Sequence, residues 1–186
     1  MIQPAVVDNF LDNYEDLKQL SLTCKFEDVV NPADGVTYPH IFKDIPVDVQ
    51  TAVKSKLEDL FGKSLTINFM FMRMSPEGVR VPHIAHTDNS MGKYSLMLYL
   101  NEGSGTSFLK HWRTGICIAP ADQSCVDLMS RDANNMEEWV ALNTVESKEN
   151  RACIFDAEYF HCAQPIGGFG KTQQDSRIVL TAFFDD

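Results

Sequence analysis

The sequence has no Cys-x-x-Cys pair, and its five cysteines are an odd number scattered along the chain. A disulfide framework needs an even set of cysteines, and a structural zinc site needs closely spaced ligands. The cysteine pattern therefore argues against both. We expect reduced thiols, as in a cytoplasmic protein.

Long apolar segments are missing as well. No uninterrupted hydrophobic run reaches the roughly 20 residues that a transmembrane helix needs. The first residues, Met1 to Pro4, lack the basic region and apolar core of a signal peptide. The sequence therefore predicts no membrane partner and favours a cytoplasmic location.

Basic residues are scarce, with 16 lysines and arginines against 26 acidic residues and a net charge of −10. No run of lysine and arginine would form a local basic patch. Because an acidic surface repels phosphate backbones, nucleic acid is not an expected partner. A small molecule or a peptide is the expected substrate, and the sequence does not determine the oligomeric state.

Helices are expected only in the N-terminal third. Residues 13–20 begin with an asparagine cap and early acidic residues, and residues 47–61 carry apolar residues at helical spacing before Gly62. Residues 24–46 resemble a loop. From Leu65 onward the pattern favours strands, expected at 65–74, 95–101, 106–109, 152–156 and 177–184.

Strands joined by glycine- and asparagine-containing turns, without intervening helices, predict a closed or sandwiched antiparallel structure. The 186 residues fit one domain. We expect residues 1–63 to form a helical support that braces one outer face, and residues 64–186 to form the β core. Residues 110–150 would be an irregular insertion, with Trp112 as part of a candidate lid.

Three separated segments carry the residues of a metal site: His86-Thr87-Asp88, His161 and Arg177. Two imidazoles and one carboxylate form the facial triad typical of non-haem Fe(II). Residues two apart in an extended chain face the same side, so His86 and Asp88 can bind one metal ion while His83 faces away. A surface turn is the alternative interpretation of the His-x-Asp motif. His161 directly follows a strand and a turn, where a ligand at a barrel mouth would lie.

The remaining histidines, His40, His83 and His111, lack such a setting and are interpreted as structural or solvated. Alternation in the last strand gives Arg177 the same face as Val179. If the leucines of residues 95–101 pack under the helices, Tyr99 points inward, and Arg177 does too. A buried guanidinium needs an anionic partner, which a dicarboxylate co-substrate would supply. The alternative is an ion pair with Asp175 or Glu158.

Taken together, these segments resemble the 2-oxoglutarate- and Fe(II)-dependent dioxygenases of the prolyl-4-hydroxylase-like branch. The segments that carry the resemblance are His86-Thr87-Asp88-Asn89, Tyr99-Leu100-Asn101, Gly105-Thr106, Phe155-Asp156, His161-Cys162-Ala163-Gln164-Pro165 and the strand from Arg177 to Phe184. The resemblance covers most of residues 70–186, and the first 60 residues match loosely.

The resemblance implies a double-stranded β-helix, also called a jelly roll, in a cupin-like fold. It implies Fe(II) bound by His86, Asp88 and His161. Arg177, helped by the Tyr99 hydroxyl, would bind the distal carboxylate of the co-substrate 2-oxoglutarate. With O₂, such an enzyme hydroxylates an unactivated C–H bond and releases succinate and CO₂.

Two features depart from the family pattern. The spacing between His161 and Arg177 is long, and a glycine-rich hairpin at residues 167–170 would have to absorb it. A tyrosine often found upstream of the first ligand is replaced by methionine, around Met72 or Met74.

Two other classes of protein would share many of these residues. A metal-dependent cupin of another reaction class would bind the metal without 2-oxoglutarate. A non-catalytic binding module would keep the fold without activity. Binding of 2-oxoglutarate separates the first from the dioxygenase, and iron binding tests the second.

Overall fold

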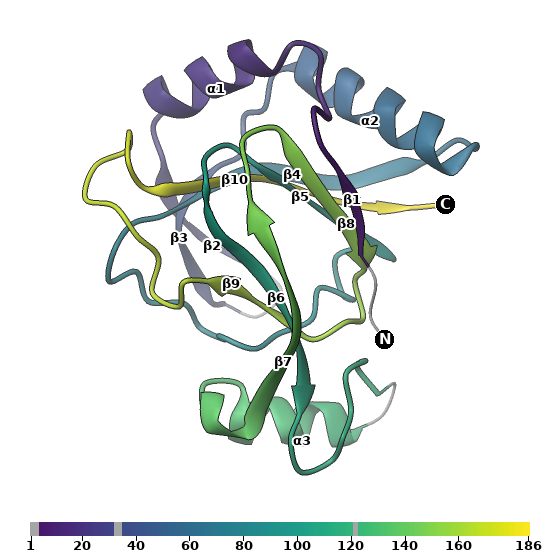
Figure 1. Cartoon of the computed structure of the whole chain (residues 1–186), viewed down its shortest axis with the longest axis vertical. Helices are drawn as coiled ribbons and strands as arrows, with labels where there is room; N and C mark the ends of the chain where they lie inside the picture. The colour runs from purple at the N-terminus through teal and green to yellow at the C-terminus, as the bar shows by residue number, and fades with distance from the viewer. Residues whose placement is uncertain (1–3, 32–34, 121–122) are drawn as a thin grey trace.

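Two antiparallel sheets form the core of the molecule, as shown by a computed structural model that describes residues 4–31, 35–120 and 123–186 (Figure 1). The larger sheet has the order β1-β8-β5-β10-β4-β3-β2, and the smaller has the order β7-β6-β9. The strands are β1 (Ala5–Val7), β2 (Glu27–Val30), β3 (Thr37–Phe42), β4 (Thr66–Ser75), β5 (Tyr94–Tyr99), β6 (Gly103–His111), β7 (Trp139–Ser147), β8 (Arg151–Asp156), β9 (His161–Gln164) and β10 (Arg177–Asp185).

Helices α1 (Tyr14–Thr23) and α2 (Val47–Phe61) cover one face of the larger sheet, as predicted, and α3 (Gln123–Asp132) lies at the opposite end of the molecule (Figure 1). The predicted bounds of α2 are confirmed. The helix ends at Gly62, whose φ of 68° is left-handed and whose N–H donates to the Glu58 carbonyl at 2.8 Å. Within the described ranges, no helix is both long and apolar enough to cross a membrane.

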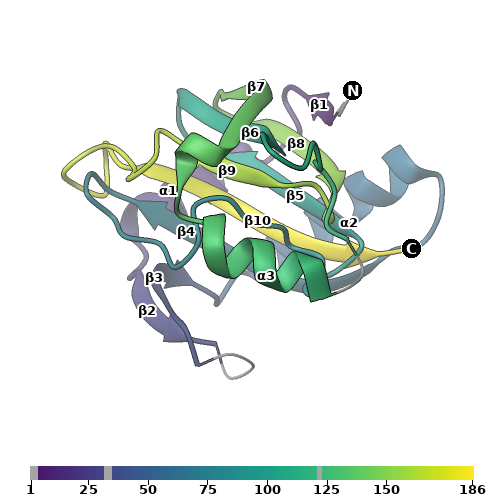
Figure 2. The same ribbon diagram turned by 90° about the horizontal axis from the view of Figure 1, so that it is seen from below.

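Two regions contain more regular structure than the sequence predicts. Residues 24–46, expected to be a loop, contain the β2–β3 hairpin at the sheet edge (Figure 2). Pro39 lies inside β3 but outside its paired positions. A proline in the sequence argues against a strand, but at an unpaired position it does not interrupt the strand's hydrogen bonds. Residues 110–150 contain α3, a 3-10 turn at 136–138 and β7. Most β7 side chains are exposed or half-buried, so the strand lacks an apolar alternation.

Side-chain alternation divides the larger sheet into two different faces. Leucines 96, 98 and 100 pack with Ile178, Leu180 and the α2 residues Val49, Val53 and Leu57 on the helix side. Tyr99 and Val179 lie on the other face, against Phe108 and Val145 of the smaller sheet. The prediction that Tyr99 points away from the helices is therefore confirmed. The space between the sheets is where the candidate site lies.

The strand register fixes which residues share that inner face. In the antiparallel pairing of β10 with β4, Arg177 is opposite Ser75 and Val179 is opposite Arg73. On its other side Val179 is opposite Tyr99 of β5. Residues opposite one another in a sheet point to the same side, so Arg73, Tyr99 and Arg177 all face inward.

Candidate metal centre

The first two predicted ligands lie on the connection between β4 and β5, which is fixed by backbone hydrogen bonds. The His86 N–H donates to the His161 carbonyl at 3.1 Å, and the His161 N–H donates back at 2.9 Å. The Asp88 N–H donates to the Ala157 carbonyl at 2.8 Å. These three bonds bring segments 69 to 75 residues apart in sequence into one site.

His86, Asp88 and His161 each offer one ligand atom, and these atoms all lie within 4.8 Å of one another. Asp88 Oδ1 is 3.9 Å from His86 Nε2, and Asp88 Oδ2 is 3.3 Å from His161 Nε2. The Ser95 hydroxyl donates to Asp88 Oδ2 at 3.3 Å. His161 Nε2 is buried and has no hydrogen-bond partner among the described residues. An orphaned buried nitrogen beside a carboxylate and a second imidazole fits a metal ligand.

Both imidazoles are oriented by carbonyl groups of the backbone. His86 Nδ1 lies 3.0 Å from the Ile84 carbonyl oxygen, and His161 Nδ1 lies 2.9 Å from the Tyr159 carbonyl oxygen. A carbonyl oxygen only accepts, so Nδ1 of each ring carries a proton, and in the neutral imidazole Nε2 has a free lone pair. Sequence reasoning missed these partners because a backbone carbonyl is common to every residue type.

The electrostatics of the three groups suit a divalent cation. Burial and the neighbouring His161 lower the pKa of His86 to about 4, so this imidazole is neutral at neutral pH. Burial opposes the ionisation of Asp88, but His161 and His86 outweigh it and hold the pKa of Asp88 below its usual value. Burial also disfavours charged His161, but Asp88 raises the pKa of His161 above its usual value. The donor set of two nitrogens and one charged oxygen fits Fe(II).

Arg177 is buried between the sheets with few partners. Its Nη2 donates to the Gly105 carbonyl at 3.3 Å, and its Nε is buried without a hydrogen-bond partner within the described ranges. Burial lowers the pKa of Arg177 to about 10, which still leaves it charged at neutral pH. In the part of the chain that the structure describes it forms no ion pair with Asp175 or Glu158, which removes that alternative.

Tyr99 is fully buried on the same inner face. Its hydroxyl donates to Thr106 Oγ1 at 2.9 Å, and burial raises its pKa well above the usual value. The structure thus places Tyr99 and Arg177 on one wall, and the Tyr99 oxygen keeps lone pairs that can accept a hydrogen bond.

The methionine expectation is corrected by the structure. Met72 is fully buried with the helix-side core, and Met74 packs against the same core, so neither faces the site. The inward residue between them is Arg73. Together with Arg177 and His86 it lines a small cavity. The alternation argument applied to Arg177 could have found Arg73, which is a lone charged residue in an apolar strand.

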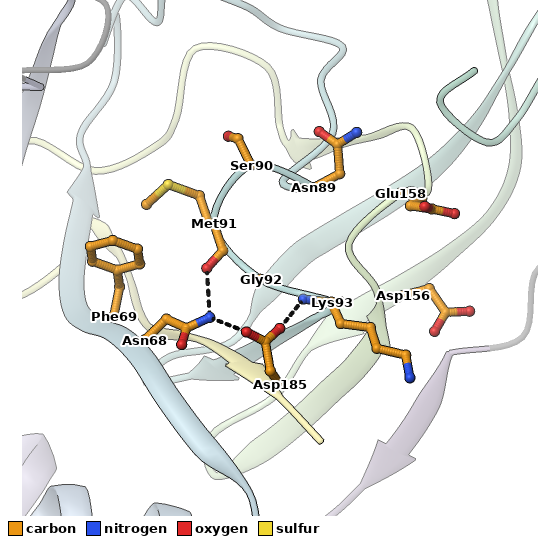
Figure 3. A pocket seen from close by; sticks show the side chains of 10 residues that line it. All are labelled: Asn68, Phe69, Asn89, Ser90, Met91, Gly92, Lys93, Asp156, Glu158 and Asp185. Atoms are coloured by element: carbon orange, nitrogen blue, oxygen red, sulfur yellow. Dashed lines mark hydrogen bonds between the residues drawn. The ribbon is translucent and has the colours of Figure 1, made fainter. Parts of the chain in front are cut away.

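A larger hollow of about 690 Å³ is lined in part by the residues that directly follow Asp88 in the sequence. Figure 3 shows the side chains that line it. Its lining includes residues 89–93 and three acidic residues, Asp156, Glu158 and Asp185. Asp185 is held by the Asn68 amide at 2.8 Å and by the Lys93 N–H at 2.7 Å (Figure 3). None of the three predicted metal ligands lines this hollow.

The other histidines take no part in the triad. His83 is exposed, and His111 is buried with its Nε2 3.1 Å from Asp132 Oδ2. His40 lies in the β2–β3 hairpin with a positive φ of 55°.

We expect His83→Ala to keep the Fe(II) affinity of the unmodified protein, whereas His86→Ala lowers it by more than about 100-fold. The reason is that only His86 directs a ring nitrogen at Asp88 and His161. Anaerobic Fe(II) titration followed by metal analysis measures both affinities. An equal loss in the two variants would contradict the assignment of His86.

Comparisons with known proteins agree with this architecture. A family model described as "Family of unknown function (DUF6445)" matches residues 3–184. No curated protein matches the chain in sequence. Among solved structures, the chain is similar to the non-heme alpha ketoglutarate dependent epimerase SnoN from nogalamycin biosynthesis. The TM-score is 0.61 at 15% identity, over 100% of this chain and 79% of that one.

Two further structures are similar over comparable lengths. HygX from Streptomyces hygroscopicus, with nickel and 2-oxoglutarate bound, matches with a TM-score of 0.58 at 10% identity, over 98% of this chain and 82% of that one. EctD from S. alaskensis, with 2-oxoglutarate and 5-hydroxyectoine, matches with a TM-score of 0.54 at 15% identity, over 98% and 72%. The predicted fold class, a jelly roll with N-terminal helices, is confirmed.

Proposed function

This chain belongs to DUF6445, a family of unknown function, and we propose that it is an Fe(II)- and 2-oxoglutarate-dependent oxygenase. One observation carries the proposal. A cluster of His86, Asp88 and His161 and a buried, charged Arg177 lie in the same space between the sheets. A metal-binding cupin of another reaction class would not need the buried arginine.

The similar structures support this proposal through their fold and through what their names say of those proteins. SnoN is described as alpha ketoglutarate dependent, and HygX and EctD were solved with 2-oxoglutarate. The prolyl-4-hydroxylase-like branch is also our proposal, and it is supported by the order of the matching segments in this sequence.

His86, Asp88 and His161 would hold the iron. When bound with 2-oxoglutarate and O₂, it supplies the oxidising power to hydroxylate an unactivated C–H bond, with release of succinate and CO₂. The residues of the chain prepare the site. The Ile84 and Tyr159 carbonyls orient the two imidazoles, and the Ser95 hydroxyl orients the Asp88 carboxylate.

Arg177 would bind the distal carboxylate of 2-oxoglutarate, and Tyr99 lies on the same wall. A guanidinium pairs with a carboxylate through two parallel hydrogen bonds. The buried Nε of Arg177, which has no partner in the described structure, is available for such a pair.

Aromatic side chains pack against His161, the second histidine of the triad. The Phe155 ring centroid is 4.9 Å from that of His161, and the Phe108 centroid is 6.4 Å away. An apolar wall excludes water and lowers the local dielectric constant, which strengthens an ion pair at Arg177.

Hydroxylation is the proposed outcome, and the substrate is a small molecule or a peptide. SnoN is described as an epimerase, so the same fold also serves a different outcome in that protein. Analysis of the product by mass separates the two, because hydroxylation adds one oxygen atom and epimerisation leaves the mass unchanged.

The experiment that tests the function needs no substrate. Under anaerobic conditions Fe(II) and then 2-oxoglutarate are added, and we expect the visible charge-transfer band of chelated 2-oxoglutarate. Succinate is the control, because it lacks the keto group and should give no band. Iron binding without a band would favour a cupin of another reaction class. Absence of iron binding would remove the functional claim.

A further inference from the structure

A second arginine, half-buried as a residue, faces the same cavity as Arg177. Arg73 is opposite Val179 in the sheet, which makes it a diagonal neighbour of Arg177 on the inner face. Its Nε and Nη2 are both buried, and neither has a hydrogen-bond partner among the residues that the structure describes. Two guanidinium groups facing one cavity repel each other, so the arrangement calls for more than one anionic group.

The formal charges in the proposed complex balance without Arg73. This step of the inference rests on the proposed function. Fe(II) contributes +2, Asp88 −1, 2-oxoglutarate −2 and Arg177 +1, which together are neutral. Asp88 also interacts favourably with the charge of Arg73, and adding that charge brings the sum of these groups to +1. A buried charge without a counter-charge is costly, which points to another anion in the assembled complex.

The surroundings of Arg73 place it nearer to solvent than Arg177. Arg177 is 3% exposed, whereas Arg73 is half-buried and its cavity is also lined by the exposed His83. Val79, Val81 and Ile166 contribute apolar side chains to the same lining, and Ile166 is 44% exposed. An incoming molecule would therefore meet a positive group flanked by apolar surface.

The two loops that carry these apolar residues, the one after β4 and the one after β9, are joined by backbone hydrogen bonds. The Val79 N–H donates to the Gly167 carbonyl at 3.2 Å, and the Glu77 N–H donates to the Gly170 carbonyl at 2.8 Å. Gly168 has a φ of 73°, and a Cβ there would lie 2.3 Å from the Ser75 carbonyl oxygen. The long connection between His161 and Arg177 thus packs closely against the end of β4, and its residues 165–168 line the cavity there.

We propose that Arg73 binds an anionic group of the substrate, a carboxylate or a phosphate, whose apolar part lies against Val79, Val81 and Ile166. Arg73 is then a specificity-determining residue, separate from the arginine that binds the co-substrate. The substrate class is a small amphipathic anion.

The test uses Zn(II)-loaded protein saturated with 2-oxoglutarate, so that Arg177 is occupied and no turnover takes place. Hexanoate, hexyl phosphate and the neutral hexanamide are titrated by calorimetry. We expect at least one of the two anions to bind 10-fold or more tightly than hexanamide, and the tighter one identifies the preferred group. Arg73→Gln should remove this preference, and Arg73→Lys should restore part of it. Arg80→Gln, in the exposed part of the neighbouring loop, is the matched control and should bind as the unmodified protein does.

Three results would overturn the proposal. The first is that no anion binds the unmodified protein more tightly than hexanamide at millimolar concentrations. The second is that Arg73→Gln binds the anions unchanged. The third is that Arg73→Gln weakens 2-oxoglutarate binding as strongly as Arg177→Met, which would assign Arg73 to the co-substrate. Thermal unfolding checks for a merely structural role, because Arg73→Gln should not lower the unfolding temperature.

Failure of the oxygenase function is distinguished by a separate titration. If Fe(II) and 2-oxoglutarate give no charge-transfer band, the same probes are titrated into metal-free protein. An anion preference that depends on Arg73 would then support the anion site while the oxygenase function fails. Loss of that preference would overturn both.

Discussion

Replacing Asp88 with alanine is expected to lower Fe(II) affinity by more than about 100-fold and to abolish the 2-oxoglutarate band. Asp88 provides the negative charge of the triad and lies 3.3 Å and 3.9 Å from the two imidazole nitrogens. Without Asp88, two neutral imidazoles would be the remaining protein ligands of a divalent cation, and one coordination position would lose its charged ligand. Anaerobic Fe(II) titration followed by absorption spectroscopy measures both effects.

Asp156→Ala is the matched control for this variant. Asp156 is an exposed carboxylate in the lining of the neighbouring hollow, outside the triad, and its loss changes the net charge by the same amount. It should leave iron affinity unchanged. Similar losses in Asp88→Ala and Asp156→Ala would show that overall charge, and not coordination by Asp88, determines iron binding.

Replacing Arg177 with methionine is expected to move ligand binding and stability in opposite directions. The dissociation constant of 2-oxoglutarate should rise by about 30- to 4000-fold, because truncating one partner of a buried charge pair costs about 2–5 kcal/mol. Fe(II) affinity should stay unchanged, because Arg177 is not a ligand. The free energy of unfolding of the metal-free protein should increase by about 1–3 kcal/mol, since an apolar chain replaces a buried charge that has one weak hydrogen-bond partner among the described residues.

Anaerobic titration with 2-oxoglutarate and urea unfolding measure the two effects of Arg177→Met. Arg80→Met is the control, because Arg80 is exposed and should change neither quantity. A variant that is less stable and still binds 2-oxoglutarate normally would assign Arg177 a purely structural role.

Periodicity predicted the parts of the fold in which one face is clearly apolar. The α2 residues Val49, Val53 and Leu57 repeat at helical spacing, and their burial against the sheet follows from it. The alternation of leucines with other residues in residues 95–101 likewise predicted that the Tyr99 side chain points away from the helices. The β2–β3 hairpin and β7 were missed because they lie at sheet edges, where exposed side chains carry no such pattern.

The parts of the candidate site that consist of metal-binding or charged side chains could be predicted from the sequence. His86, Asp88, His161 and Arg177 were selected from residue type and spacing, and the structure brings them into one space between the sheets. Arg73 was not predicted, because the tyrosine of the family pattern corresponds to the methionines on either side of it, Met72 or Met74. The carbonyls of Ile84 and Tyr159 could not be predicted, since their role depends on the path of the backbone.

The backbone bridge between His86 and His161 has a consequence for folding. His86 belongs to the connection between two strands of the larger sheet, and His161 begins a strand of the smaller one, so a metal ion held by both would cross-link the two sheets. An ion that binds the folded chain and not the unfolded one contributes about 2.7 kcal/mol when its free concentration is 100 times its dissociation constant. The supply of metal would then determine how long this protein survives in its folded state, as well as whether it can act.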